Sequence, residues 1–134
     1  YYSSWIVDTV SLHPSIGMMA TNWTVPTAPE SRGPVPGMSS VYLFNGLETG
    51  TGHGGTSKGI LQPVLSYGKS GCILNPLAGW RFTAFYVTGS GRAYCGKVIE
   101  VEEGDALQGR MTKSGDSWTI EADAGGKGVS SHTV

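Results

Sequence analysis

Gln62 is the residue of this chain best placed to do chemistry, because it is an amide set among aliphatic residues in segment 59–68, GILQPVLSYG. Alternation along an extended strand puts Ile60, Gln62 and Val64 on one face. A buried amide needs hydrogen-bond partners, since leaving it unpaired costs free energy. Two interpretations stay open: a structural amide satisfied by neighbouring backbone, or a polar group placed in a groove to meet a ligand.

Other residues that could line such a groove alternate with apolar neighbours in nearby segments. Aromatic rings and a few polar groups are the usual lining of a ligand site. The candidate ligand-binding residues are Gln62, Tyr42, Asn45, Arg81, Thr83, Phe85 and Tyr86, with Gln108, Arg110 and Glu121 as further polar candidates. For any one of them the alternative is a core position or a solvated sheet face.

Metal and nucleophile chemistry find little support in the sequence. His13, His53 and His132 have no carboxylate or cysteine at ligand spacing, so we expect no metal site and no cofactor. Cys72 and Cys95 flank a predicted strand and could pair across a hairpin, and we expect one disulfide rather than a nucleophile.

Composition indicates a domain built from strands. Only 14% of the 134 residues are charged, and 21 glycines and seven prolines supply turns. No apolar stripe at helical spacing is present. We therefore predict one all-β domain over residues 1–134, an antiparallel β-sandwich or jelly roll. The expected strands are 16–25, 41–44, 59–68, 80–87, 94–95, 98–101, 107–112, 118–122 and 129–134.

Charge and motifs bear on partners and location. A net charge of −1 without a basic cluster argues against nucleic acid as a partner, and no apolar run is long enough to cross a membrane. The first residues, 1–5 (YYSSW), are typical of a processed end. Asn22-Trp23-Thr24 is an N-glycosylation sequon. Together with the paired cysteines, these features predict a secreted protein.

The order of short motifs along nearly the whole chain resembles that of the secreted fungal glutamic peptidases, the eqolisins. The motifs are 21–27 (TNWTVPT), 41–49 (VYLFNGLET), 59–62 (GILQ), 82–86 (FTAFY), 103–107 (EGDAL) and 129–134 (VSSHTV). The resemblance implies a concanavalin-like sandwich in which Gln62 takes the place of the catalytic glutamine. It also implies that the catalytic glutamate belongs to a strand beyond residue 134. The family's tryptophan and two acidic residues correspond to Tyr42, Gly46 and Ala84.

An amide alone cannot take a proton from water, so Gln62 without a carboxylate does not catalyse. We therefore expect a secreted, non-catalytic protein that binds carbohydrate in lectin fashion, or a peptide, around Gln62. One alternative is the N-terminal chain of a glutamic endopeptidase, completed by a C-terminal companion chain. Another is a structural or defence protein that forms homo-oligomers through the terminal strand, because an open strand edge favours pairing.

Overall fold

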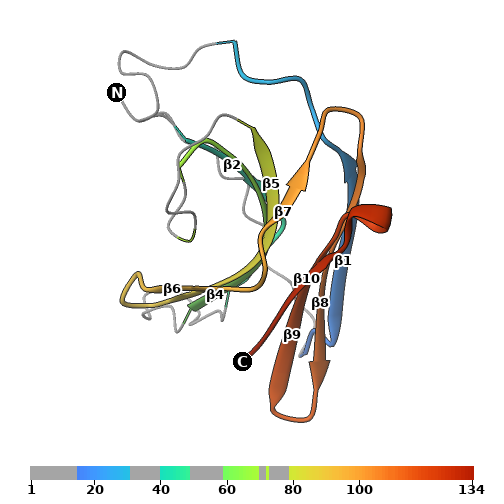
Figure 1. The fold of residues 1–134 in the computed structure, drawn as a ribbon. Coiled ribbons are helices and arrows are strands. Elements are labelled where there is room, and N and C mark those ends of the chain that lie inside the picture. Colours follow the sequence, from blue (N-terminus) through green and yellow to red (C-terminus); the bar gives the residue numbers. More distant parts are fainter. Residues whose placement is uncertain (1–14, 31–39, 49–58, 70–71, 73–78) are drawn as a thin grey trace.

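The structure is a computed structural model that describes residues 15–30, 40–48, 59–69, 72 and 79–134. Ten strands and one 3₁₀ turn, η1 (Gly125–Lys127), lie in this part of the chain (Figure 1). The strands are β1 (Met18–Thr24), β2 (Val41–Phe44), β3 (Leu47–Glu48), β4 (Gly59–Tyr67), β5 (Trp80–Thr88), β6 (Ala93–Cys95), β7 (Ile99–Val101), β8 (Ala106–Ser114), β9 (Ser117–Asp123) and β10 (Val129–Thr133).

The strands form two antiparallel sheets packed face to face. Sheet A has the order β1-β8-β9-β10, and sheet B has the order β2-β4-β5-β6, with β3 paired to β4 and β7 paired to β5. Figure 1 shows sheet B curving so that its hollow side faces away from sheet A. The predicted all-β antiparallel sandwich is confirmed. The jelly-roll and concanavalin-like topologies stay predictions.

The predicted strands are found within one or two residues of their expected ends. The strand 41–44 has the expected bounds, and β5 runs one residue further than 80–87. Two short elements were not predicted: β3, which is only two residues long, and η1, a single 3₁₀ turn between β9 and β10. The candidate histidines His13 and His53 and the segment 1–5 lie outside the described residues.

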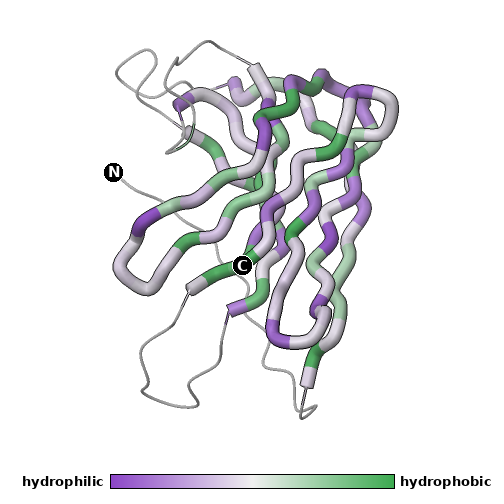
Figure 2. Tube along the Cα trace, turned by 60° about the horizontal axis from the view of Figure 1, so that its bottom comes forward, coloured by the Kyte–Doolittle hydropathy of each residue, from purple (hydrophilic) through white to green (hydrophobic). Residues whose placement is uncertain are grey.

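The core lies between the sheets and is divided into two clusters. The larger one joins Leu65, Trp80 and Phe82 of sheet B to Leu107 and Ala122 of sheet A. The smaller one is built around Leu61, Ala84, Met111 and Ile120. Figure 2 shows hydrophilic and hydrophobic residues alternating along the strands of sheet A. This alternation gives sheet A one buried and one solvated face, the pattern expected of antiparallel sheets.

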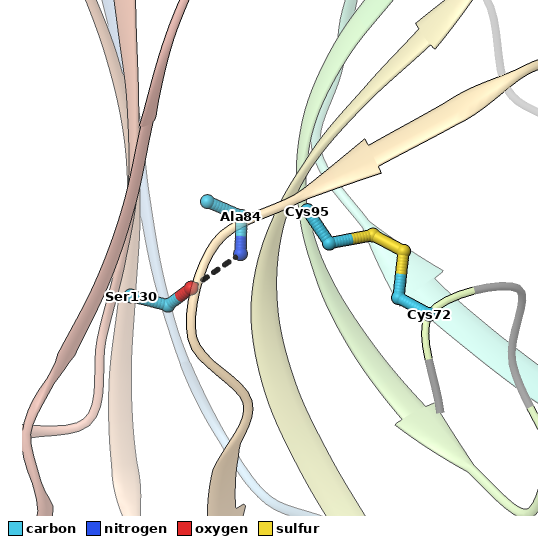
Figure 3. Close-up of a disulfide and its surroundings, with 4 residues drawn as sticks. All are labelled: Cys72, Ala84, Cys95 and Ser130. Carbon is cyan, nitrogen blue, oxygen red and sulfur yellow. Dashed lines mark hydrogen bonds between the residues drawn. A yellow bond between two sulfur atoms is a disulfide. The ribbon is translucent and has the colours of Figure 1, made fainter. Parts of the chain in front are cut away.

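A side chain from sheet A completes the hydrogen bonding of β5. Along one edge, β5 pairs with β7 at Trp80–Phe82 and with β6 at Phe85–Val87, so the ladder is interrupted near Ala84. The Ala84 carbonyl accepts from the Gly96 N–H at 2.9 Å. The Ala84 N–H donates to the Ser130 Oγ of β10 at 3.0 Å, as drawn in Figure 3. Ser130 thus links the two sheets by a buried hydrogen bond.

An ion-pair cluster ties the turn between β7 and β8 to η1. Lys127 Nζ lies 2.7 Å from Asp105 Oδ2 and 3.1 Å from Glu102 Oε2. The Glu102 N–H donates to the same Asp105 oxygen at 2.7 Å. The pKa of Asp105 is lowered mainly by the hydrogen bond from Lys127 and to a smaller extent by that from the Glu102 N–H. The pKa of Lys127 is raised mainly by its hydrogen bond to Asp105 and to a smaller extent by that to Glu102.

Among the residues that the structure describes, no helix is long and apolar enough to cross a membrane.

Candidate functional site

Gln62 lies on the side of sheet B that faces away from sheet A. Leu61 and Leu65 of β4 belong to the core between the sheets, so the residues alternating with them point the other way. We call this side the Gln62 face. On β4 it comprises Ile60, Gln62, Val64 and Ser66, which confirms the alternation predicted from sequence.

The neighbours of Gln62 follow from strand register. On one side Gln62 pairs with Phe85 of β5. On the other side, Phe44 of β2 pairs with Val64 and Leu47 of β3 pairs with Leu61. The two pairs have the same register, and this register places Gly46, which lies between the two strands, opposite Gln62. Gly46 itself presents no side chain to the amide, and the position of its missing Cβ is bordered by Ile60 Cγ2 at 3.4 Å and Phe44 Cδ2 at 3.5 Å. Gln62 is half-buried, and its side chain makes no hydrogen bond to any described residue.

Two aromatic rings are exposed on β2, the outermost strand on this side of sheet B among the described residues. Tyr42 pairs with Ser66 and Phe44 with Val64, so both rings belong to the Gln62 face. They are 45% and 44% exposed. The Tyr42 hydroxyl donates to the Lys69 carbonyl at 3.0 Å, and this contact fixes the direction of its ring.

Glu48 is a carboxylate that sequence reasoning did not assign to this site. Glu48 of β3 pairs with Ile60, the residue two positions before Gln62 on the same face. Diagonal neighbours on one face of a sheet are about 7–8 Å apart, within reach of long side chains or of a bridging water. Glu48 is identified by the register of β2 and β3 against β4, which continues without a shift from one strand to the next. The sequence alone does not reveal this register.

Three other predicted lining residues lie on the Gln62 face but are buried. Arg81 is 6% exposed, Thr83 is fully buried, and Phe85 is 4% exposed. Their neighbour Ser66 is fully buried as well. The hydroxyls of Ser66 and Thr83 have no hydrogen-bond partner among the described residues. These four residues form the floor of the Gln62 face, and Gln62, Tyr42, Phe44 and Glu48 are the more accessible groups.

The remaining predicted lining residues point elsewhere. Tyr86 packs against the core between the sheets and stacks with Tyr94 at 6.2 Å between ring centroids. Asn45 reaches toward sheet A, where its Nδ2 donates to the Gly109 carbonyl at 3.5 Å. The structure therefore does not bring Tyr86 or Asn45 together with Gln62.

The further polar candidates lie on sheet A. Arg110 pairs with Glu121 in register, and their side chains form an ion pair at 2.7 Å on the solvated face. Gln108, two residues before Arg110 on β8, shares that face. None of the three belongs to the Gln62 face. Their alternation with apolar residues reflects the solvated face of sheet A instead of a groove on sheet B.

The predicted disulfide between Cys72 and Cys95 is confirmed, with 6.2 Å between the Cα atoms. Cys95 pairs with Phe85, which pairs with Gln62, so the disulfide ends the cross-strand row that contains the candidate amide. Figure 3 shows the disulfide and Ser130 on opposite sides of β5. The bond thus lies on the same side of sheet B as Gln62, whereas Ser130 lies between the sheets.

Within the described part of the chain, no group of three or more histidine, cysteine, aspartate or glutamate residues lies close enough to hold a metal ion. His132 instead stacks on Tyr94, with ring centroids 6.3 Å apart. The more accessible groups of the Gln62 face are an amide, a carboxylate and aromatic rings.

Comparison of the chain with protein-family models, curated proteins and solved structures gives no match in any of the three. The resemblance to glutamic peptidases therefore stays a prediction that depends on the sequence motifs.

Proposed function

We propose that this protein is a secreted, non-catalytic binding protein and that it binds carbohydrate on the Gln62 face. The observation that carries the proposal is a half-buried Gln62 amide without a described hydrogen-bond partner, on the same face as the exposed rings of Tyr42 and Phe44. The amide atoms of Gln62 are not among the buried atoms without a partner, so a ligand that hydrogen-bonds them replaces water, with a net gain of about 0.5–1.5 kcal/mol per hydrogen bond.

The chemistry around the amide fits a sugar. Amide and carboxylate groups hydrogen-bond hydroxyls, and Gln62 and Glu48 supply one of each. Tyr42 and Phe44 expose flat apolar surface on the same face, where a sugar ring can lie. The intramolecular disulfide is compatible with an extracellular protein.

Binding to an array of glycans, followed by titration calorimetry with the best one, tests the proposal. Gln62→Ala removes one neutral hydrogen-bonding group, and a loss of about 0.5–1.5 kcal/mol corresponds to roughly 2–12-fold weaker binding. Tyr42→Ala removes a ring from the same face and should weaken binding similarly. Thr119→Ala, on the solvated face of sheet A, is the control and should bind like the wild type.

A steric variant sharpens the test. A Cβ on Gly46 would lie 3.4 Å from Ile60 Cγ2, 3.4 Å from the Leu61 carbonyl oxygen and 3.5 Å from Phe44 Cδ2, so a larger side chain there would crowd the groups around Gln62. Gly46→Val, checked by circular dichroism to be folded, should weaken binding. Folded wild-type protein that binds no glycan, or a Gly46→Val variant that binds as well as wild type, contradicts the proposal.

A second candidate function is acid endopeptidase, favoured by the position of Glu48. The reaction needs a carboxylate as general acid/base on a water and an amide to stabilise the oxyanion, and Glu48 and Gln62 are of those types. Cleavage of a denatured protein at acidic pH, abolished both by Gln62→Ala and by Glu48→Gln, would support it. Absence of cleavage by folded protein carrying both residues would exclude catalysis by this pair.

A further inference from the structure

Asn22 is presented to solvent at the outer strand of sheet A. Within the described residues, β1 has a partner on one side only, β8. Trp23 points into the core and packs edge-to-face on Phe82, with 5.4 Å between ring centroids. Its neighbours Asn22 and Thr24 therefore point outward, and both are exposed. The two side chains of an Asn-X-Thr motif thus stand on one accessible face.

The Asn22 amide is held with its oxygen inward and its nitrogen free. Gln108 Nε2 donates to Asn22 Oδ1 at 2.9 Å, from the residue that pairs with Asn22 in register. The amide nitrogen Nδ2 makes no hydrogen bond to a described residue. Nδ2 is the atom that carries sugar in N-glycosylated proteins, so the orientation leaves the reactive end of the amide outward.

A shallow hollow of about 460 Å³ lies beside this amide. The hollow is open to solvent, so it can contact one side of a single sugar ring. The small residues Ala106 and Gly125 leave the space open, and Gln108 and Asp123 supply polar groups at its side. One Asp123 oxygen accepts from the Gly125 N–H at 2.8 Å, and the other is available to a sugar hydroxyl.

We propose that Asn22 is N-glycosylated and that the first sugar of the glycan lies in this hollow. Asn22 Nδ2 forms a bond to the anomeric carbon of an oligosaccharide carried on a lipid diphosphate. The amide nitrogen loses one proton and the lipid diphosphate leaves, so no oxidation or reduction occurs. The sugar then packs on the Ala106 methyl group and hydrogen-bonds Asp123. Because the hollow is on sheet A, the glycan leaves the Gln62 face of sheet B open.

Secretion from a eukaryotic host, followed by intact mass measurement with and without endoglycosidase, tests the modification. The sequence contains one Asn-X-Ser/Thr motif, so one glycan is expected. Asn22→Gln and Thr24→Ala should remove the added mass, and the matched variant Thr24→Ser should keep it. Secreted wild-type protein with the mass of the bare chain would overturn the proposal.

The position of the sugar is tested separately by NMR on the glycosylated protein. Nuclear Overhauser contacts are expected between the first sugar and the Ala106 methyl group, because Ala106 lines the hollow. Ala20, exposed on the same face two residues before Asn22, is the internal control and should show none. A glycosylated protein without contacts to Ala106, or with equal contacts to Ala20, refutes the seating of the sugar.

Discussion

Replacement of Ser130 by alanine should destabilise the protein, because it removes one oxygen and also leaves a buried backbone N–H without an acceptor. Ser130 is fully buried and accepts the hydrogen bond of the Ala84 N–H, which falls where the β5 ladder passes from β7 to β6. The neighbourhood is tightly packed, since a Cβ on Gly96 would lie only 2.6 Å from Ser130 Oγ. In Ser130→Ala the buried Ala84 N–H loses its partner, and little room exists for water to replace it.

The expected cost is about 1–3 kcal/mol, the penalty for leaving a buried donor unsatisfied. With an unfolding entropy of about 2.1 cal/mol/K per residue, each kcal/mol corresponds to about 4 °C in Tm for a chain of this length. Ser130→Ala should therefore melt about 4–12 °C below the wild type. Ser131→Ala changes an exposed neighbour on the same strand and should stay within about 0.5 kcal/mol.

Calorimetry gives the Tm, and hydrogen exchange of the Ala84 amide gives a local measure. In the wild type this amide should exchange only through large-scale opening, because it is buried and bonded across the two sheets. In Ser130→Ala it should exchange faster than the amides of the β8–β9 ladder. A variant that melts with the wild type and keeps Ala84 protected would refute the role given to this hydrogen bond.

Two further predictions concern stability. Because the hydrogen bond from Lys127 lowers the pKa of Asp105, the carboxylate stabilises the fold above its unfolded pKa of about 3.9, and this stabilisation is lost as pH falls through the folded pKa. Urea titrations at several pH values should therefore show that Asp105→Asn loses less stability on acidification than the wild type does. An Asp105→Asn variant with the pH profile of the wild type would contradict this. Gly109→Ala would place a Cβ 2.5 Å from Pro63 Cγ between the sheets and should lower the free energy of unfolding by about 1–3 kcal/mol in the same titrations. Gly17→Ala, where nothing lies within 4 Å of the added Cβ, is the control and should be nearly neutral. Equal stability of the two variants would show that the sheets adapt to the added methyl group.

Much of the architecture follows from local pattern. The many glycines and the alternating segments predicted short antiparallel strands, and the strand 41–44 was placed with its observed bounds. Alternation also put Gln62 on the face opposite Leu61, because successive side chains of any strand point to opposite sides. The two cysteines were correctly paired, since the described chain offers each no other thiol partner.

Long-range pairing decided the composition of the candidate site. Register brought Glu48 to the Gln62 face and placed Gly46 opposite the amide. Alternation along their own strands put Asn45 and Tyr86 on the opposite side, and the packing of the two sheets made that side the core. Arg81, with a charge that suggested a groove lining, was buried in its floor.

The sequence by itself determined which residues form strands and which side of its own strand each one takes, because both depend on neighbours along the chain. The tertiary structure alone decided which strands lie together and which of their two faces meets the other sheet. That choice is made by the summed burial of residues far apart in sequence, such as Phe82 with Leu107, and no local pattern contains it.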